Sequence, residues 1–109
     1  MPGFVLTHAA KADLKAIARY TEETWGRDQR NRYLALLDRS FHEVVANPLL
    51  GRDCSDIRAG YRKHRVGKHM VFYRQSATGP TEIVRILHER MDVATRLPEP
   101  DSETERDRR

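Results

Sequence analysis

The chain has 109 residues and a mass of 12.7 kDa, which predicts one small domain with a modest core. Charged residues make up 33% and hydrophobic residues 39%, a composition typical of soluble proteins, and no apolar run reaches the length of a membrane span. The single cysteine, Cys54, excludes an internal disulfide framework and a multi-cysteine zinc site. Because the first residues lack the basic and apolar segments of a signal peptide, we expect a cytoplasmic protein.

The net charge of +4 is unevenly distributed along the chain. Residues 99–109 hold five acidic residues and three arginines, a net charge of −2, which leaves +6 on residues 1–98. Sixteen of the twenty basic residues are arginine, whose planar guanidinium suits carboxylates and phosphates. The charge therefore favours an anionic partner, either a nucleic acid or an acidic protein segment.

The N-terminal half predicts a short strand followed by two helices. The strand covers residues 4–6, and Thr7 is placed to cap the helix that follows. Apolar residues at helical spacing predict that this helix covers residues 8–25, and Gly26 is placed to end it. A second apolar stripe predicts a helix over residues 28–46. Because so few residues separate the two helices, we expect an antiparallel helical hairpin.

The C-terminal half changes to the pattern of strands. Residues 47–60 show no clear period and are interpreted as a loop. Strands are predicted after this loop at residues 61–66, 69–74 and 82–88. Gly67 and Lys68 are expected to form a two-residue turn between the first two strands. A short helical turn over residues 92–97 and a disordered charged tail over residues 99–109 are expected to follow.

This order of elements predicts an α+β fold with an N-terminal strand, an antiparallel two-helix hairpin and a three-stranded antiparallel meander. Burying the apolar stripes of both helices requires the pair to pack on one face of an antiparallel sheet. The second face of the sheet would be only partly covered. Depending on register, it would carry Arg62, Arg65, Tyr73, Arg74 or Arg85. Since no internal repeat is found, we predict a single domain over residues 1–98.

No stretch of the sequence matches a catalytic or cofactor-binding motif. There is no glycine-rich phosphate loop, and the five histidines do not have metal-ligand spacing with the acidic residues. Cys54 has no base beside it in the sequence and is expected to be an inert thiol. We therefore predict no catalytic residue, no metal ion and no cofactor.

Basic residues are concentrated in the predicted meander, where strand pairing could bring several onto one surface. They are Arg62, Lys63, Arg65, Lys68, His69, Arg74, Arg85, His88 and Arg90. Such a surface could serve a metal-free nuclease, with His88 as the general acid or base and arginines that hold the phosphate. It could also bind an acidic or extended partner chain, or it could be an ordinary solvated face.

Several separated runs of the sequence match one family in both residues and spacing. They are YTEETWG at residues 20–26 followed by Gln29, Tyr33 and Leu37, NP at residues 47–48 followed by Gly51, IRAGYRK at residues 57–63, HMVFYR at residues 69–74, and RILHERMD at residues 85–92. On these runs the chain resembles the ParE toxins of bacterial type II toxin–antitoxin systems. The resemblance covers residues 3–97, which is nearly everything except the tail.

The resemblance implies the fold of the RelE/ParE superfamily, a helical hairpin on a small antiparallel sheet. It also implies a toxin that inhibits DNA gyrase by binding and is neutralised by a ParD-like antitoxin. Such an antitoxin has a ribbon-helix-helix N-terminal half that binds operator DNA and an acidic, amphipathic C-terminal half that wraps the toxin. The toxin is then expected to meet operator DNA only through its antitoxin.

The antitoxin is expected to lie across the groove of the hairpin and an edge of the sheet. The residues expected to contact it are Trp25, Tyr33, Leu37, Arg62 and Arg74. Because Trp25 and Tyr33 lie on apolar stripes, their position favours the core over an interface. The target is expected to contact the basic surface of the meander and the segment after it, through Arg62, Arg65, Arg74, Arg85, His88 and Arg90.

Two other activities fit the same superfamily. One is ribosome-dependent mRNA cleavage of the RelE type, for which Arg62, Arg65 and His88 are the candidate residues. Glu89 next to His88 would repel a phosphate, and the meander has only two lysines, so both features weigh against cleavage. The other alternative is a toxin that has lost its activity and only binds its antitoxin.

Overall fold

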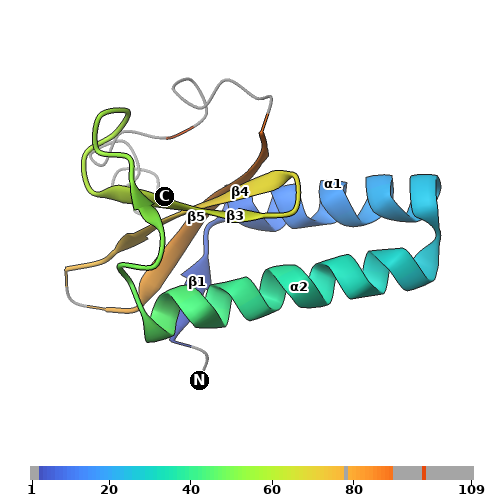
Figure 1. Cartoon of the computed structure of the whole chain (residues 1–109), viewed down its shortest axis with the longest axis horizontal. Helices are drawn as coiled ribbons and strands as arrows, with labels where there is room; N and C mark the ends of the chain where they lie inside the picture. The colour runs from blue at the N-terminus through green and yellow to red at the C-terminus, as the bar shows by residue number, and fades with distance from the viewer. Residues whose placement is uncertain (1–2, 78, 90–96, 98–109) are drawn as a thin grey trace.

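The computed structural model describes residues 3–77, 79–89 and 97, and it has an α+β fold with two helices on one face of a five-stranded sheet (Figure 1). The elements are β1 (Phe4–Leu6), α1 (His8–Trp25), α2 (Arg27–Ala46), β2 (Arg52–Asp53), β3 (Tyr61–Val66), β4 (His69–Gln75) and β5 (Thr81–His88). Each predicted helix and strand within the described residues is present, with ends that differ by at most one residue. The predicted turn over residues 92–97, apart from Leu97, and the predicted tail lie outside the described residues.

The two ends of α1 are set by a polar residue and a glycine. The Thr7 hydroxyl oxygen accepts a hydrogen bond from the Ala10 amide at 3.0 Å, and the hydroxyl donates to the Val84 carbonyl of β5 at 2.7 Å. At the other end, Gly26 has a φ of 94°, a conformation that residues with a side chain adopt only with strain. Since α2 begins at the next residue, this one glycine makes the whole connection of the hairpin.

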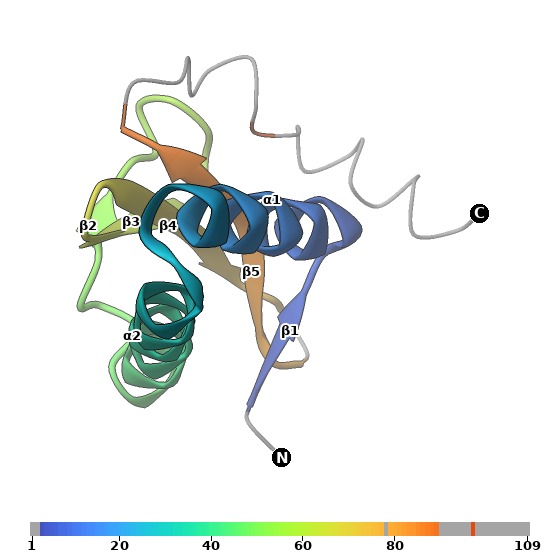
Figure 2. The same ribbon diagram turned by 90° about the vertical axis from the view of Figure 1, so that its right-hand side faces the viewer.

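The strand order of the sheet is β1-β5-β4-β3-β2. Strands β3, β4 and β5 form the predicted antiparallel meander, with the predicted turn at Gly67 and Lys68. The prediction of a wholly antiparallel sheet is wrong, because β1 pairs with β5 in parallel (Figure 2). The segment interpreted as a loop also contains the two-residue strand β2, which pairs with β3. A parallel pair needs a long connection, so no local turn marks it in the sequence.

The main core lies between the helical hairpin and the sheet. Its buried side chains are Ala10, Ile17, Leu37, Phe41, Val44, Val66, Val71, Tyr73, Ile83 and Ile86. The members from α1 and α2 belong to the apolar stripes that predicted the helices. Tyr73 therefore faces the helices and not the opposite face of the sheet.

A smaller core covers the face of the sheet that is turned away from the helices, and we call it the far-face core. It contains Cys54, Tyr61, Phe72, Val84, Leu87 and Leu97, with Ile57 and Met70 packed against them. This face is covered more fully than the sequence analysis predicted, because residues such as Cys54 and Leu97 pack over it. Cys54 and Ile57 come from a segment without periodicity, so no sequence pattern indicated that this segment folds over the sheet.

Candidate functional site

An open groove lies between the two helices, and we call it the hairpin groove. It has a volume of about 350 Å³. Its lining is mostly apolar and borders the main core, yet the groove is open to solvent. The lining residues are Phe4 and Leu6 from β1, Leu14, Lys15 and Ala18 from α1, and Leu34, Asp38 and Phe41 from α2. An apolar groove between helices is a surface on which an amphipathic partner helix packs.

The helical repeat explains which residues line the hairpin groove. Leu14 and Ala18 are four residues apart on α1 and share one face, and Leu34 and Asp38 have the same relationship on α2. Lys15 and Asp38 add one charge of each sign to this lining. The apolar stripes were visible in the sequence, but we assigned them to the core, since the pattern does not show which part of a stripe the sheet leaves uncovered.

The three apolar residues expected to bind the antitoxin have three different environments. Trp25 is 70% exposed at the last position of α1, so the prediction that it belongs to the core is wrong. It is exposed because the chain reverses at Gly26 and no described residue covers that end of the helix. Tyr33 is half-buried and packs against the main core. Leu37 has no exposed surface, so a partner on this surface cannot touch it and we withdraw it from the expected contacts.

A hydrogen-bonded link joins α2 to the turn between β3 and β4. The Tyr33 hydroxyl lies 3.0 Å from the Val66 carbonyl and 2.6 Å from Nδ1 of His69. Because the hydroxyl has one hydrogen to donate, a bond to the carbonyl leaves Nδ1 of His69 as the donor of the second bond. Burial, followed by the neighbouring His88, lowers the pKa of His69 and favours its neutral ring.

The arginines of the meander do not share one surface. Arg62 pairs with Tyr73 across the ladder and so lies on the helical face, where its Nη1 donates to the Gly51 carbonyl at 2.7 Å. Arg74 lies on the opposite face, where its Nε donates to Glu82 at 2.6 Å and its guanidinium lies over the Tyr61 ring. Both arginines therefore hold parts of the fold together.

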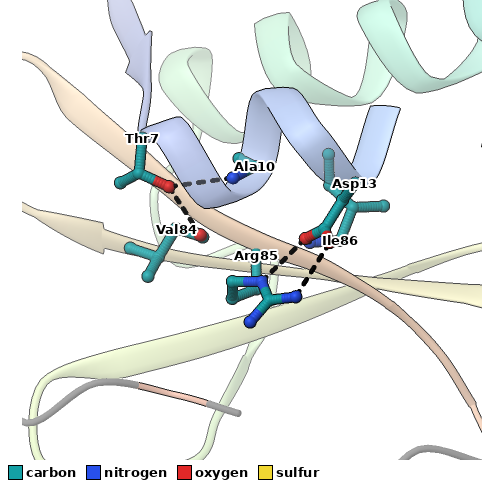
Figure 3. A network of polar contacts seen from close by, with 6 residues as sticks. All are labelled: Thr7, Ala10, Asp13, Val84, Arg85 and Ile86. Carbon is teal, nitrogen blue, oxygen red and sulfur yellow. Dashed lines mark hydrogen bonds and ion pairs between the residues drawn. The ribbon is translucent and has the colours of Figure 1, made fainter. Parts of the chain in front are cut away.

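Arg85 is engaged even more closely within the chain. Its Nε and Nη2 each donate to one carboxylate oxygen of Asp13 on α1 at 2.8 Å, as Figure 3 shows. The Ile86 amide donates to the same carboxylate at 2.9 Å. With both side chains mostly buried, the predicted role of Arg85 as an exposed target contact is not supported, and the residue instead locks α1 to the sheet.

The remaining predicted target residues lie near the end of β5. His88 pairs with His69 on the helical face, with ring centroids 5.5 Å apart. Arg65 lies on the opposite face and forms an ion pair with Glu89 at 2.8 Å, with its own side chain 56% exposed. Arg90 lies outside the described residues. The expected single basic surface is therefore not assembled by the described residues.

The described residues offer few groups for catalysis or for metal binding. Cys54 is buried, and burial raises the pKa of its thiol, which disfavours the reactive thiolate. No group of three or more His, Cys, Asp and Glu residues within the described ranges could hold a metal ion. In the same part of the chain, neither helix is long and apolar enough to cross a membrane.

The sequence matches a known family over most of its length. Residues 4–93 match the family described as ParE toxin of type II toxin-antitoxin system, parDE. The chain is 44% identical to Toxin ParE1 of Mycobacterium tuberculosis over 94 residues, which are 86% of this chain and 96% of that protein. It is 40% identical to Toxin ParE of Escherichia coli over 97 residues, 89% of this chain and 94% of that protein. The chain therefore belongs to the ParE toxin family of type II toxin–antitoxin systems, as the sequence runs predicted.

The fold is also shared with a protein of known structure. A chain from the structure described as the chromosomal ParDE TA system from P. aeruginosa matches with a TM-score of 0.68 and 21% sequence identity. The match covers 78% of this chain and 92% of that one. This likeness confirms the predicted α+β class, a helical hairpin on a small sheet.

Proposed function

We propose that the protein is held inactive by a ParD-like antitoxin whose amphipathic segment lies in the hairpin groove. The observation that carries this proposal is the groove itself, an apolar surface left open between α1 and α2. A matching structure is described as a ParDE system, which supports an antitoxin of the ParD type. The net charge of +6 on residues 1–98 favours an acidic segment as the occupant.

The antitoxin is proposed to join the toxin to DNA. Its N-terminal ribbon-helix-helix half binds the operator, and its acidic C-terminal half binds the toxin. The toxin then reaches operator DNA only indirectly, and the whole system works in the cytoplasm without a membrane partner. Arg62 and Arg74 stay as proposed antitoxin contacts at the edge of the sheet, whereas Trp25 and Tyr33 do not line the hairpin groove and are withdrawn as antitoxin contacts.

A pair of alanines on α1 tests the position of the antitoxin. Ala18 lines the hairpin groove, whereas Ala16 is exposed on the same helix and does not line it. Ala18→Glu places a bulky negative charge where an acidic helix would lie, so we expect its affinity for the antitoxin to fall about tenfold or more. Ala16→Glu changes helix propensity and charge equally and should bind normally. Equal affinities for the two variants would contradict the proposed position.

The proposed target of the toxin is DNA gyrase, which it inhibits by binding and not by catalysis. Membership of the ParE toxin family supports this target. The candidate nuclease residues support binding over cleavage, because Arg62 and Arg65 lie on opposite faces of the sheet. Arg62 and His88 also pair with positions on β4 that are four residues apart, or roughly 13 Å along the strand.

Controlled expression in a bacterial host separates the possible activities. A gyrase inhibitor should arrest growth and shift a reporter plasmid toward relaxed topoisomers. Growth arrest with cleaved mRNA and unchanged plasmid topology would favour the RelE-type nuclease instead. Normal growth at a high level of folded protein would favour a toxin that has lost its activity.

A further inference from the structure

A second cavity lies between the tip of the hairpin and the turn that joins β3 and β4, and we call it the turn pocket. It has a volume of about 430 Å³. Its lining residues are Tyr20, Thr21, Trp25, Gln29, Tyr33, Gly67, Lys68, His69, His88 and Glu89. They come from α1, α2, the β3–β4 turn and the end of β5, and they include residues from three of the runs that carry the family resemblance.

The turn pocket is separate from the hairpin groove and differs from it in chemistry. Among the residues that the structure describes, none lines both cavities. The hairpin groove is lined mainly by aliphatic residues and phenylalanine, which suits a long-lived apolar contact. The turn pocket combines aromatic rings with histidines and charged groups, so it is the more polar of the two surfaces, whereas permanent interfaces are the more hydrophobic class. Two surfaces of different character fit two partners.

Exposed aromatic rings form the outer wall of the turn pocket. Trp25 is 70% exposed and Tyr20 is 66% exposed, the former at the end of α1 and the latter on its last turns. Both rings keep large apolar surfaces in water, and covering such surfaces stabilises a complex. Tryptophan and tyrosine are also the residue types that most often dominate the binding energy of protein interfaces.

The inner wall of the turn pocket is held rigid before any partner arrives. The Tyr33 hydroxyl contacts both His69 and the Val66 carbonyl, and His69 contacts the His88 ring edge to face. Gly67 brings the turn so close to Tyr33 that an added Cβ would lie 2.8 Å from its ring. A wall ordered in advance reduces the entropy lost on binding.

The charges of the turn pocket are not balanced. Glu89 is neutralised by its ion pair with Arg65, which holds the pKa of the Glu89 carboxyl below its usual range. Lys68, at the tip of the turn, makes no ion pair with any residue that the structure describes. The pocket therefore offers one ammonium group, which complements a carboxylate on a partner.

We propose that the turn pocket is the surface through which the toxin binds its protein target. The pocket takes an aromatic or branched apolar side chain of the target, which packs against Trp25 and Tyr20. A carboxylate beside that side chain binds Lys68. This proposal rests on the proposed function, since it requires a toxin that acts by binding, and it assigns the target to a different surface from the antitoxin.

The test compares pocket variants with matched controls in three measurements. The pocket variants are Trp25→Ala and Lys68→Glu. The controls are Leu49→Ala, at a residue that is 72% exposed, and Lys11→Glu on α1, and neither residue lines the hairpin groove or the turn pocket. For each protein we would measure the expression level that halves bacterial growth rate, the affinity for the ParD-like antitoxin of the same operon, and the thermal unfolding midpoint.

Both pocket variants should need about tenfold more protein to slow growth, with antitoxin affinity and unfolding midpoint close to wild type. The two controls should behave as wild type throughout. Unchanged toxicity of both pocket variants would overturn the proposal, and so would a loss of antitoxin affinity with toxicity retained. A wild-type protein that arrests growth but leaves purified gyrase unaffected would exclude gyrase as the target. The comparison of growth between pocket variants and controls would still decide whether the turn pocket binds the true target.

Discussion

Asp13 on α1 and Arg85 on β5 form an ion pair with two parallel hydrogen bonds of 2.8 Å each, although they are 72 positions apart in the sequence. The same Asp13 carboxylate accepts the Ile86 amide at 2.9 Å, at a point of β5 that lies beyond its pairing with β1 (Figure 3). A strand edge with unpaired amides attracts other chains. Asp13 thus attaches the hairpin to the sheet and also occupies an edge position of β5.

Replacing Asp13 should therefore destabilise the protein markedly. Asp13→Ala leaves the mostly buried Arg85 without its carboxylate and the Ile86 amide without its acceptor, and we expect a loss of about 2–3 kcal/mol in the free energy of unfolding. Asp38→Ala is the matched control, because Asp38 is exposed on α2 and lies 3.5 Å from His42. Urea unfolding measures both. Equal losses of unfolding free energy for the two variants would show that the Asp13–Arg85 ion pair contributes little to stability.

The hydroxyl of Tyr73 should contribute measurably to stability. It donates to the Pro48 carbonyl and accepts from the Gly51 amide, each at 2.8 Å, and so fastens the segment after α2 to the sheet. Tyr73→Phe leaves both groups without this partner and should cost about 1–2 kcal/mol of unfolding free energy. Tyr20→Phe makes the same chemical change at an exposed site and should cost much less. If both variants unfold at the wild-type urea midpoint, the hydroxyl is not an anchor.

Stability should decrease as the pH falls below about 6.5, the ordinary pKa of histidine. Burial, followed by His88, lowers the pKa of His69 in the folded protein, so the unfolded chain binds the proton first. The neutral His69 ring therefore makes its full contribution to the free energy of unfolding above about pH 6.5. This contribution is lost as the pH falls toward the lower pKa that His69 has in the folded protein. His69→Gln should have a smaller difference in unfolding free energy between about pH 7.5 and about pH 5.5 than wild type. A His69→Gln protein that keeps the wild-type difference would show that His69 is not the source of this pH dependence.

The chain should tolerate loss of its tail only as far as Leu97. Leu97 is buried in the far-face core, and its carbonyl accepts a hydrogen bond from Arg58 at 3.3 Å. A chain that ends at Pro98 should keep the unfolding midpoint and toxicity of the full chain. A chain that ends at residue 96 loses the Leu97 side chain and should be less stable by about 2–3 kcal/mol. Loss of toxicity on truncation at Pro98 would show that the charged tail has a role.

Local signals were sufficient to predict both helices and every strand except β2. Thr7 caps α1, Gly26 separates the helices, and Gly67 with Lys68 turns β3 into β4, all as the sequence indicated. Each of these residues acts on its own immediate backbone, so a single sequence contains the required information. The parallel pairing of β1 with β5 depends on packing between distant segments and was missed for that reason.

The binding surfaces were harder to predict than the fold. Arg85 and Arg74 looked like surface cations because their partners, Asp13 and Glu82, cannot be recognised before the register is known. Trp25 lies on an apolar stripe and was assigned to the core, but a stripe continues to the end of a helix whether or not the sheet covers that end. The turn pocket could not be predicted from the sequence, because its walls come from separate segments that meet only when the hairpin packs on the sheet.

The most direct test of the proposed function is the supercoiling of relaxed plasmid by purified gyrase in the presence of this protein. Supercoiling should decrease as the protein concentration rises, and addition of the ParD-like antitoxin should restore it. Linear DNA among the products would indicate that the toxin traps gyrase with its DNA cleaved. Full supercoiling in the presence of an excess of folded protein would contradict gyrase inhibition.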